Sequence, residues 1–229
     1  DAGRRIVYER VKDYWAKDLA VAKGQNNFDE ISYIYFKDRT PAFEAFKSGA
    51  FDFYIDNQAK NWSIGYNFPA VRSGAIKREE ISHQIPTQTQ TLFMNTRRSV
   101  FKDRNVREAM GLMFDFEWTN RTLFSNAYKR SSSYYPNSVF AAVEKPEGQE
   151  WLLLSPYRKQ LQARLFMEPF KLPQTHGNGI PRETLRKALG LLAKAGWKPG
   201  GQGLVNDRGE PLRFEIMLVN PNLERILQP

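Results

Sequence analysis

A polar run near the middle of the chain is made of side chains that can hydrogen-bond a polar ligand. Thr87, Gln88, Thr89, Gln90 and Thr91 follow one another without an apolar residue between them. Amides and hydroxyls can donate and accept hydrogen bonds, which suits the N–H and C=O groups of a peptide backbone. Gln88 and Gln90 are therefore candidate ligand contacts at a cleft edge. The alternative is a solvated, threonine-rich strand that contacts no ligand.

Aromatic side chains in two polar loops could wall such a ligand. Trp62 and Tyr66 lie in one loop, and Tyr134 and Tyr135 lie in the other. An aromatic ring offers a large apolar surface, and loops often carry binding residues. The alternatives are that Trp62 covers the core and that the tyrosines belong to an ordinary loop. Asn95 is the last candidate contact, although a turn in which its side chain bonds the nearby backbone is the simpler interpretation.

The residues that usually perform catalysis are scattered. His83 and His176 are the only histidines, they lie far apart in sequence, and the chain has no cysteine, so a zinc site is not expected. Glu79 and Glu80 are adjacent, and adjacent residues on a strand face opposite sides. Residues 200–203 are rich in glycine but follow an expected helix, whereas a phosphate-binding loop precedes one. We expect no catalytic residue, no metal and no cofactor, and therefore not an enzyme.

The composition is that of a globular protein with a basic surface. The chain has 229 residues, of which 41% are hydrophobic and 26% charged, and its formal net charge is +9. Such a charge suits nucleic acid, anionic membranes or acidic ligands. A basic nucleic-acid-binding module is therefore the alternative hypothesis. Lysine and arginine are spread along the chain rather than clustered, which counts against it. The absence of cysteine fits a reducing cytosol or a periplasm, and no apolar run approaches the about 18 residues that span a bilayer.

Helix and strand signals alternate irregularly in the first half of the chain. Thr40 and Pro41 favour a helix start with Thr40 as the N-cap, and Gly49 suits the left-handed residue after its end. Residues 30–55 therefore predict a strand–helix–strand unit. The expected strands of this half are residues 5–10, 30–36, 51–55, 76–81 and 92–94.

Helices dominate the second half. One is expected from Asp103 or Asn105 to about Phe124, because apolar residues recur at helical spacing. Gly196 and Trp197 suit the cap of another. The chain is thus expected to be of mixed α/β class. The remaining expectations are helices at residues 157–165, 181–195 and 221–227, a linker at 171–179, and a hairpin at 204–218 with its turn at 206–209.

The order of several segments resembles the extracellular solute-binding proteins of family 5, and most of all their YejA-like branch. The most specific match is residues 93–109, which resembles the family pattern F-N-T-x-x-P-F-x-D-x-R-V-R-x-A. It departs from that pattern at Val100, where the family usually has proline, and at Asn105, where it usually has arginine. The other matching segments are residues 5–15, 33–53, 57–71 and 185–214.

The resemblance implies a type II periplasmic-binding fold, in which two lobes joined by crossover strands close on a solute. Residues 1–86 would be part of the first lobe, residues 87–229 part of a second lobe truncated at its C-terminus, and a hinge crossing would lie near residues 84–95. The implied function is capture of oligopeptides or similar solutes in the periplasm for the membrane permease of an ABC importer. A monomer without nucleic acid is expected, and the chain reads as a fragment of a longer protein, or as a mature protein that lacks an initiator methionine.

Overall fold

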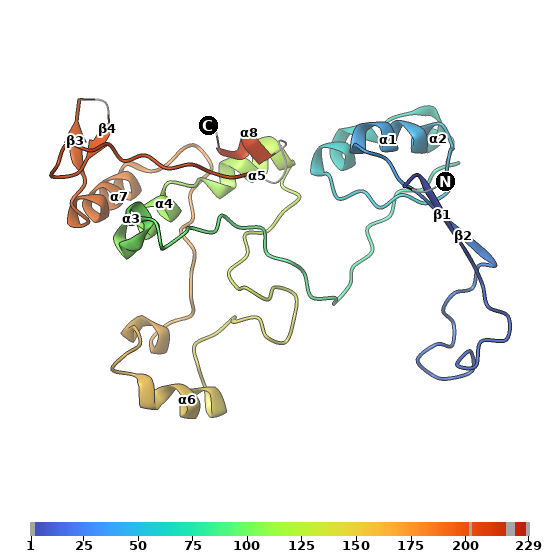
Figure 1. The fold of residues 1–229 in the computed structure, drawn as a ribbon, viewed down its shortest axis with the longest axis horizontal. Coiled ribbons are helices and arrows are strands. Elements are labelled where there is room, and N and C mark those ends of the chain that lie inside the picture. Colours follow the sequence, from blue (N-terminus) through green and yellow to red (C-terminus); the bar gives the residue numbers. More distant parts are fainter. Residues whose placement is uncertain (1–2, 202, 219–222, 228–229) are drawn as a thin grey trace. The chain divides into compact units, whose positions relative to one another are not determined.

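The computed structural model describes residues 3–201, 203–218 and 223–227 (Figure 1). The chain divides into two units, Asp1–Arg78 and Glu79–Pro229. Each unit combines helices with short strands, which agrees with the expected mixed class. Within the described ranges, no helix has both the length and the apolar character needed to cross a bilayer.

The first unit begins with a two-stranded antiparallel ribbon. Strand β1 (Arg5–Glu9) pairs with β2 (Glu30–Ile34), so both expected strands are confirmed, β2 ending two residues early. The rings of Tyr8 and Tyr33 meet edge to face with centroids 5.8 Å apart. Cross-strand aromatic pairs of this kind contribute to the stability of a ribbon.

Helix α1 (Arg39–Lys47) follows the ribbon, and its start differs from the expectation. The N-cap is Asp38, whose extended backbone precedes the first turn, although its side chain makes no capping bond. The prediction that Thr40 caps the helix is therefore wrong, because Thr40 lies inside the first turn. Gly49 has φ +78°, as expected for the left-handed residue after a helix.

Aromatic rings form the interior of the first unit. Phe43 and Phe46 of α1 are buried. The ring of Tyr54 stacks on that of Phe46 with centroids 5.4 Å apart, and the ring of Phe51 lies 5.6 Å from Phe46 by the same measure. Residues 51–55 consequently place rings on the helix without joining a described ladder, so the expected strand is not formed. Two short helical turns lie in the segment expected to be a loop: η1 (Asn61–Gly65) and α2 (Pro69–Arg72).

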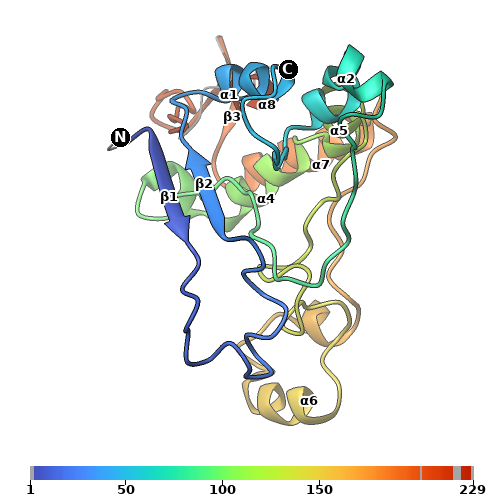
Figure 2. The ribbon, with the colours of Figure 1, turned by 90° about the vertical axis from the view of Figure 1, so that its right-hand side faces the viewer.

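Two helices make the core of the second unit (Figure 1 and Figure 2). Helix α4 (Arg104–Leu112) packs against α7 (Arg182–Lys194), and Val106 at their contact is fully buried. Ala188 is buried at this contact, whereas Leu185 and Leu189 of the same helix are 40% and 44% exposed. Because the buried residue Ala188 is small, the backbones of α4 and α7 can lie close together.

The helix expected from Asp103 to Phe124 is two helices. Asp103 caps α4 as predicted, its carboxylate accepting from the backbone N–H of Asn105 at 2.7 Å. A second carboxylate, that of Asp115, accepts from the N–H of Trp118 at 2.9 Å and starts α5 (Phe116–Phe124). Aspartate stabilises helix starts by this bond, so Asp115 interrupts the periodic pattern after Leu112.

The C-terminal end of α7 has the expected cap. Gly196 has φ +86°, the N–H of Trp197 donates to the Leu192 carbonyl at 2.9 Å, and the N–H of Gly196 donates to Ala193 at 3.0 Å. These two bonds define a Schellman motif. The chain then forms an antiparallel pair of short strands, β3 (Lys198–Gly200) and β4 (Gly203–Val205).

The remaining elements are short, and several expectations fail there. The predicted turn at residues 206–209 is present, but residues 212–218 join no described ladder beyond the bridge between Val205 and Pro211. The expected strands at 76–81 and 92–94 are absent from the described structure. Instead of a helix at 157–165 the chain has α6 (Gly148–Leu154), η2 (Ser155–Tyr157) and η3 (Ala163–Phe166). Helix α3 (Ser99–Lys102) precedes α4, and α8 (Glu224–Leu227) lies in the helix expected from residue 221, of which 221 and 222 are outside the described residues.

Candidate functional site

The polar run lies against a loop that is distant in sequence. We call residues 83–91 the glutamine segment and residues 131–142 the tyrosine loop. The backbone N–H of Thr87 donates to the Pro136 carbonyl at 3.1 Å, and the hydroxyl of Thr89 donates to the Ser133 carbonyl at 3.1 Å. The structure therefore brings together two of the groups of candidate residues that the sequence suggested.

One side chain of the tyrosine loop fixes the start of the glutamine segment. The amide nitrogen of Asn137 donates to the carbonyl oxygens of His83 at 3.0 Å and Ile85 at 2.8 Å. Asn137 has φ +56°, a left-handed conformation that asparagine adopts more readily than most residues. Sequence reasoning missed this residue, although an asparagine between Pro136 and Ser138 is a signal for such a turn.

The two glutamines on either side of Thr89 take no part in this contact. Thr89 is half-buried against the loop, whereas Gln88 and Gln90 are exposed. Their side-chain amides make no hydrogen bond with any other residue that the structure describes. Tyr134 and Tyr135 of the adjoining loop are 78% and 63% exposed. The two joined segments thus offer unpaired amides on one and accessible aromatic side chains on the other, groups that can contact a peptide-like solute.

Asn95 forms a turn in which its side chain bonds the nearby backbone, which is the simpler of the two interpretations. Its side-chain oxygen accepts from the backbone N–H of Arg97 at 3.1 Å and from the Nε of Arg97 at 3.3 Å. The N–H of Arg98 donates to the Asn95 carbonyl at 3.0 Å. The side chain therefore closes a turn before α3, and a role in ligand contact stays a prediction.

Tyr66 belongs to the aromatic interior of the first unit. Its ring meets Phe43 edge to face at 5.2 Å, and its hydroxyl donates to the Oδ2 of Asp56 at 3.1 Å. Burial, followed by the negative charge of Asp56, raises the pKa of Tyr66. The hydroxyl consequently stays protonated and keeps its bond at neutral pH.

Trp62 lies beside Tyr66 and carries a cation on its ring. The ring centroids are 5.7 Å apart, and the guanidinium carbon of Arg78 lies 4.7 Å from the Trp62 ring. Arg78 also donates to the Trp62 carbonyl at 2.6 Å. Trp62 and Tyr66 are thus brought together within the first unit, and they form a second group of candidate residues apart from the glutamine segment.

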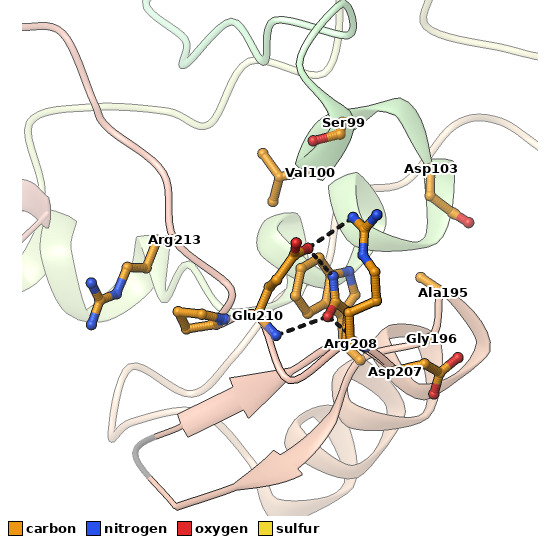
Figure 3. A pocket seen from close by; sticks show the side chains of 12 residues that line it. Ser99, Val100, Asp103, Ala195, Gly196, Asp207, Arg208, Glu210 and Arg213 are labelled. Carbon is orange, nitrogen blue, oxygen red and sulfur yellow. Dashed lines mark hydrogen bonds and ion pairs between the residues drawn. The ribbon is translucent and has the colours of Figure 1, made fainter.

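A pocket of about 410 Å³ lies at the C-terminal end of α7 (Figure 3). Arg208 reaches the carboxylate of Glu210 at 2.8 Å, as the dashed lines of Figure 3 show. Hydrogen bonds from Asn206 and Arg208 lower the pKa of Glu210. Arg208 and Glu210 neutralise one another, and none of the candidate residues lines the pocket. Within the described ranges, no three histidine, aspartate or glutamate side chains gather into a metal-binding cluster.

Comparison with known proteins decides the family. The sequence profile of the bacterial extracellular solute-binding proteins, family 5, matches residues 1–228. The chain belongs to this family. Membership implies a type II periplasmic-binding fold and a location in the periplasm or outside the cell.

Relatives within family 5 match almost the whole chain. The protein named "Uncharacterized protein YejA" from Escherichia coli (strain K12) is 45% identical over 217 residues, which are 94% of this chain and 36% of the relative. From Agrobacterium fabrum (strain C58), "Peptidoglycan-binding protein YepA" is 39% identical and "Probable peptide-binding protein YejA" is 34% identical. They cover 98% and 99% of this chain, and 38% of each relative. The chain therefore spans little more than a third of the length of the curated relatives it matches.

Proposed function

We propose that the whole protein containing this chain is the substrate-binding component of an ABC importer. It captures oligopeptides or peptide-like solutes in a cleft between two lobes and delivers them to a permease in the inner membrane. Family 5 membership supports a solute-binding role, and the names of two relatives refer to peptidoglycan and to peptide. The lobes divide near residues 86 and 87, the hinge crossing lies near residues 84–95, and the protein works as a periplasmic monomer without nucleic acid.

The observation that carries the peptide proposal is the contact between the glutamine segment and the tyrosine loop. It joins the two segments and leaves the amides of Gln88 and Gln90 exposed on one and Tyr134 and Tyr135 exposed on the other. An extended peptide presents alternating donors and acceptors along its backbone, and a primary amide can answer both. Tyrosine rings supply apolar surface that tolerates different side chains.

The net positive charge of the chain indicates which class of peptide it would bind. The chain carries 34 lysines and arginines against 25 aspartates and glutamates. A positive potential raises the association rate of anionic ligands. The proposed solutes are therefore peptides with acidic groups, which include the peptides attached to peptidoglycan.

Thermal shift with peptides of graded length tests the proposal on the whole protein. A ligand that binds only the folded state raises the melting temperature, so an acidic alanine–glutamate peptide should raise it at lower concentration than an alanine–lysine peptide of equal length. The double variant Gln88→Ala/Gln90→Ala should lose most of the shift. Gln160→Ala removes an equally exposed amide of the same unit and should leave the shift unchanged. No shift with any peptide would exclude peptides as the solute.

A further inference from the structure

A half-buried arginine stands at the entrance of the tyrosine loop. The guanidinium carbon of Arg130 lies 5.7 Å from the ring of Phe114 and 6.0 Å from that of Phe116. Its Nη1 donates to the carbonyl oxygen of Pro173 at 2.5 Å. Pro173 begins residues 173–179, which we call the strap. Arg130 is the residue immediately before the tyrosine loop, so this bond connects the start of the loop to a segment about forty residues further along the chain.

The strap itself is bound to the first turns of α5 by charged groups. The hydroxyl of Thr175 donates to the Oδ1 of Asp115 at 2.5 Å, and its N–H donates to the Oε2 of Glu117 at 3.1 Å. From the other side Arg121 donates to the carbonyl of Gly177. Hydrogen bonds with one charged partner are the stronger kind, so the strap is a fixed point to which Arg130 can be anchored.

The close approach of the strap to α5 also fixes its position. Gly177 is buried and has φ +69°. A Cβ at this residue would lie 2.9 Å from the Nη1 of Arg121 and 3.1 Å from the backbone carbon of Glu117. Only glycine fits this place without displacement of the helix, so the strap has little freedom to slide.

We propose that Arg130 is a positioning residue: by its anchorage to the strap it holds the tyrosine loop where Ser133 and Pro136 can accept hydrogen bonds from the glutamine segment. The inference rests on the proposed function only in taking the glutamine segment as the solute-binding edge. It assigns to Arg130 a role in the site although the residue itself contacts no candidate ligand residue.

Only a few residues separate Arg130 from Gln88 and Gln90 along these contacts. Ser133 lies three residues after Arg130 and accepts from Thr89, whose two neighbours are Gln88 and Gln90. The acceptors are backbone carbonyls of an irregular loop, so their positions depend on how the ends of the loop are held. A displacement of about 1 Å would lengthen these bonds beyond effective hydrogen-bond distance.

A guanidinium suits this position better than an ammonium. The guanidinium carbon lies over the two phenylalanine rings while its Nη1 donates to a carbonyl; a guanidinium is planar with five donors in a fixed geometry, whereas an ammonium is a compact and more strongly hydrated charge. Burial lowers the pKa of Arg130, whereas the charges of Glu117 and Asp115 raise it; the group nevertheless remains charged at neutral pH. Arg130→Lys should therefore retain part of the anchorage and Arg130→Gln should lose nearly all of it.

Hydrogen exchange of the protein without ligand measures the positioning directly. In Arg130→Gln the hydrogen-bonded amides of the two segments, above all that of Thr87 on the Pro136 carbonyl, should exchange on the order of tenfold faster, because a hydrogen bond to a charged group is lost. The amides of α4 and α7 should keep their rates. Arg130→Lys should lie between Arg130→Gln and the parent protein, and Thr175→Val, which loosens the strap from the other side, should accelerate the same two segments.

Two matched variants separate positioning from a general loss of charge or stacking. Lys129→Gln removes a positive charge from the exposed neighbour of Arg130. Arg158→Gln removes an arginine that lies over Trp151 and Phe166 in the same unit. Both should leave exchange of the glutamine segment unchanged. Equal acceleration in Arg158→Gln, or unchanged rates in Arg130→Gln, would overturn the proposal.

Calorimetric titration with an alanine–glutamate pentapeptide separates this inference from the proposed function. If both hold, Arg130→Gln weakens binding several-fold and Arg130→Lys restores part of it. If exchange accelerates while the parent protein binds no peptide, Arg130 positions the loop and the peptide function is refuted. If the parent protein binds the peptide and Arg130→Gln changes neither exchange nor affinity, the positioning role is refuted and the peptide function stands.

Discussion

The hydroxyl of Thr89 donates to the carbonyl oxygen of Ser133 at 3.1 Å, across 44 residues of sequence. This bond turns Thr89 toward the tyrosine loop and leaves Gln88 and Gln90 on the exposed side of the extended chain. Neither residue belongs to a regular strand or helix. The edge of the candidate site therefore depends on side-chain hydrogen bonds between two irregular segments, which makes those bonds suitable targets for substitution.

Asn137 is the first such target. Asn137→Ala should increase exchange of the hydrogen-bonded amides of Ile85 and Thr87, because the bonds that hold the His83 and Ile85 carbonyls are removed and because alanine at φ +56° costs about 1–2 kcal/mol. Asn137→Gly tolerates the left-handed backbone but lacks the amide, so it isolates the hydrogen bonds. If the glycine variant exchanges like the parent protein, the side-chain bonds contribute nothing and only the backbone conformation matters.

Alanine substitution of two glycines, one within α7 and one just after its C-terminal end, should change the free energy of unfolding in opposite directions. Gly196→Ala should lower the free energy of unfolding by about 1 kcal/mol or more, because residue 196 has φ +86° in the Schellman cap. Gly190→Ala lies in the exposed middle of the helix, where an added Cβ meets nothing within 4 Å. It should raise the free energy of unfolding by about 0.5–1 kcal/mol. Urea denaturation of both variants checks the prediction, and a loss of stability in Gly190→Ala would contradict it.

Asp115 should make stability depend on pH in the acid range. Burial raises the pKa of Asp115, but hydrogen bonds from Thr175, Trp118 and Gly179 outweigh that effect and lower the pKa below its ordinary value of 3.8. A carboxylate with a lowered pKa in the folded state adds stability that is complete above 3.8 and is lost as pH falls through the lower, folded-state value. Below pH 3.8 the parent protein should therefore lose stability more steeply than Asp115→Asn.

Substitutions at Asp115 also separate its charge from its helix cap. Asp115→Asn retains an oxygen that can accept from the N–H of Trp118, whereas Asp115→Ala removes the cap and should cost about 1 kcal/mol more at neutral pH. Urea denaturation at neutral and acid pH measures both effects. Parallel pH profiles of the parent protein and Asp115→Asn would show that the carboxylate charge has no part in the fold.

The features that sequence could predict are those decided within a few residues. Asp103 caps a helix and Gly196 follows one because a side chain or a conformation next to the helix end is sufficient. The prediction of one helix as far as Phe124 failed because apolar spacing continues past Leu112, whereas the Asp115 cap ends it. Two local signals competed there, and the periodic pattern does not indicate which is stronger.

The candidate site was predictable as residues but not as an arrangement. Exposed glutamines and tyrosines could be selected by chemistry, and Thr89 lies where alternation places it. The contact of Thr89 with Ser133 and the anchorage of Arg130 join segments of irregular structure over more than forty residues. No periodicity marks such pairs, since each depends on how loops are folded rather than on a repeating pattern.

Trp62 gives the sharpest test of the second group of candidate residues. Arg78 lies over its ring at 4.7 Å, a cation–aromatic contact worth about 0.5–1 kcal/mol when exposed. Trp62→Ala should therefore lower the stability of the first unit modestly whether or not the ring contacts solute. If the ring is also a wall of the site, Trp62→Ala should weaken binding of an alanine–glutamate peptide several-fold, and Trp62→Phe should retain most of the affinity.

The decisive control leaves the ring and removes the cation. Arg78→Gln abolishes the stacking on Trp62 and the bond to its carbonyl, so it reproduces the local loss of stability. Calorimetric titration compares the affinities of both variants for the same peptide, and urea denaturation compares their stabilities. Affinity that falls only in Trp62→Ala places the indole in the site. Affinity that falls equally in both would mean that Trp62 acts through the fold, and unchanged affinity in both would remove it from the site.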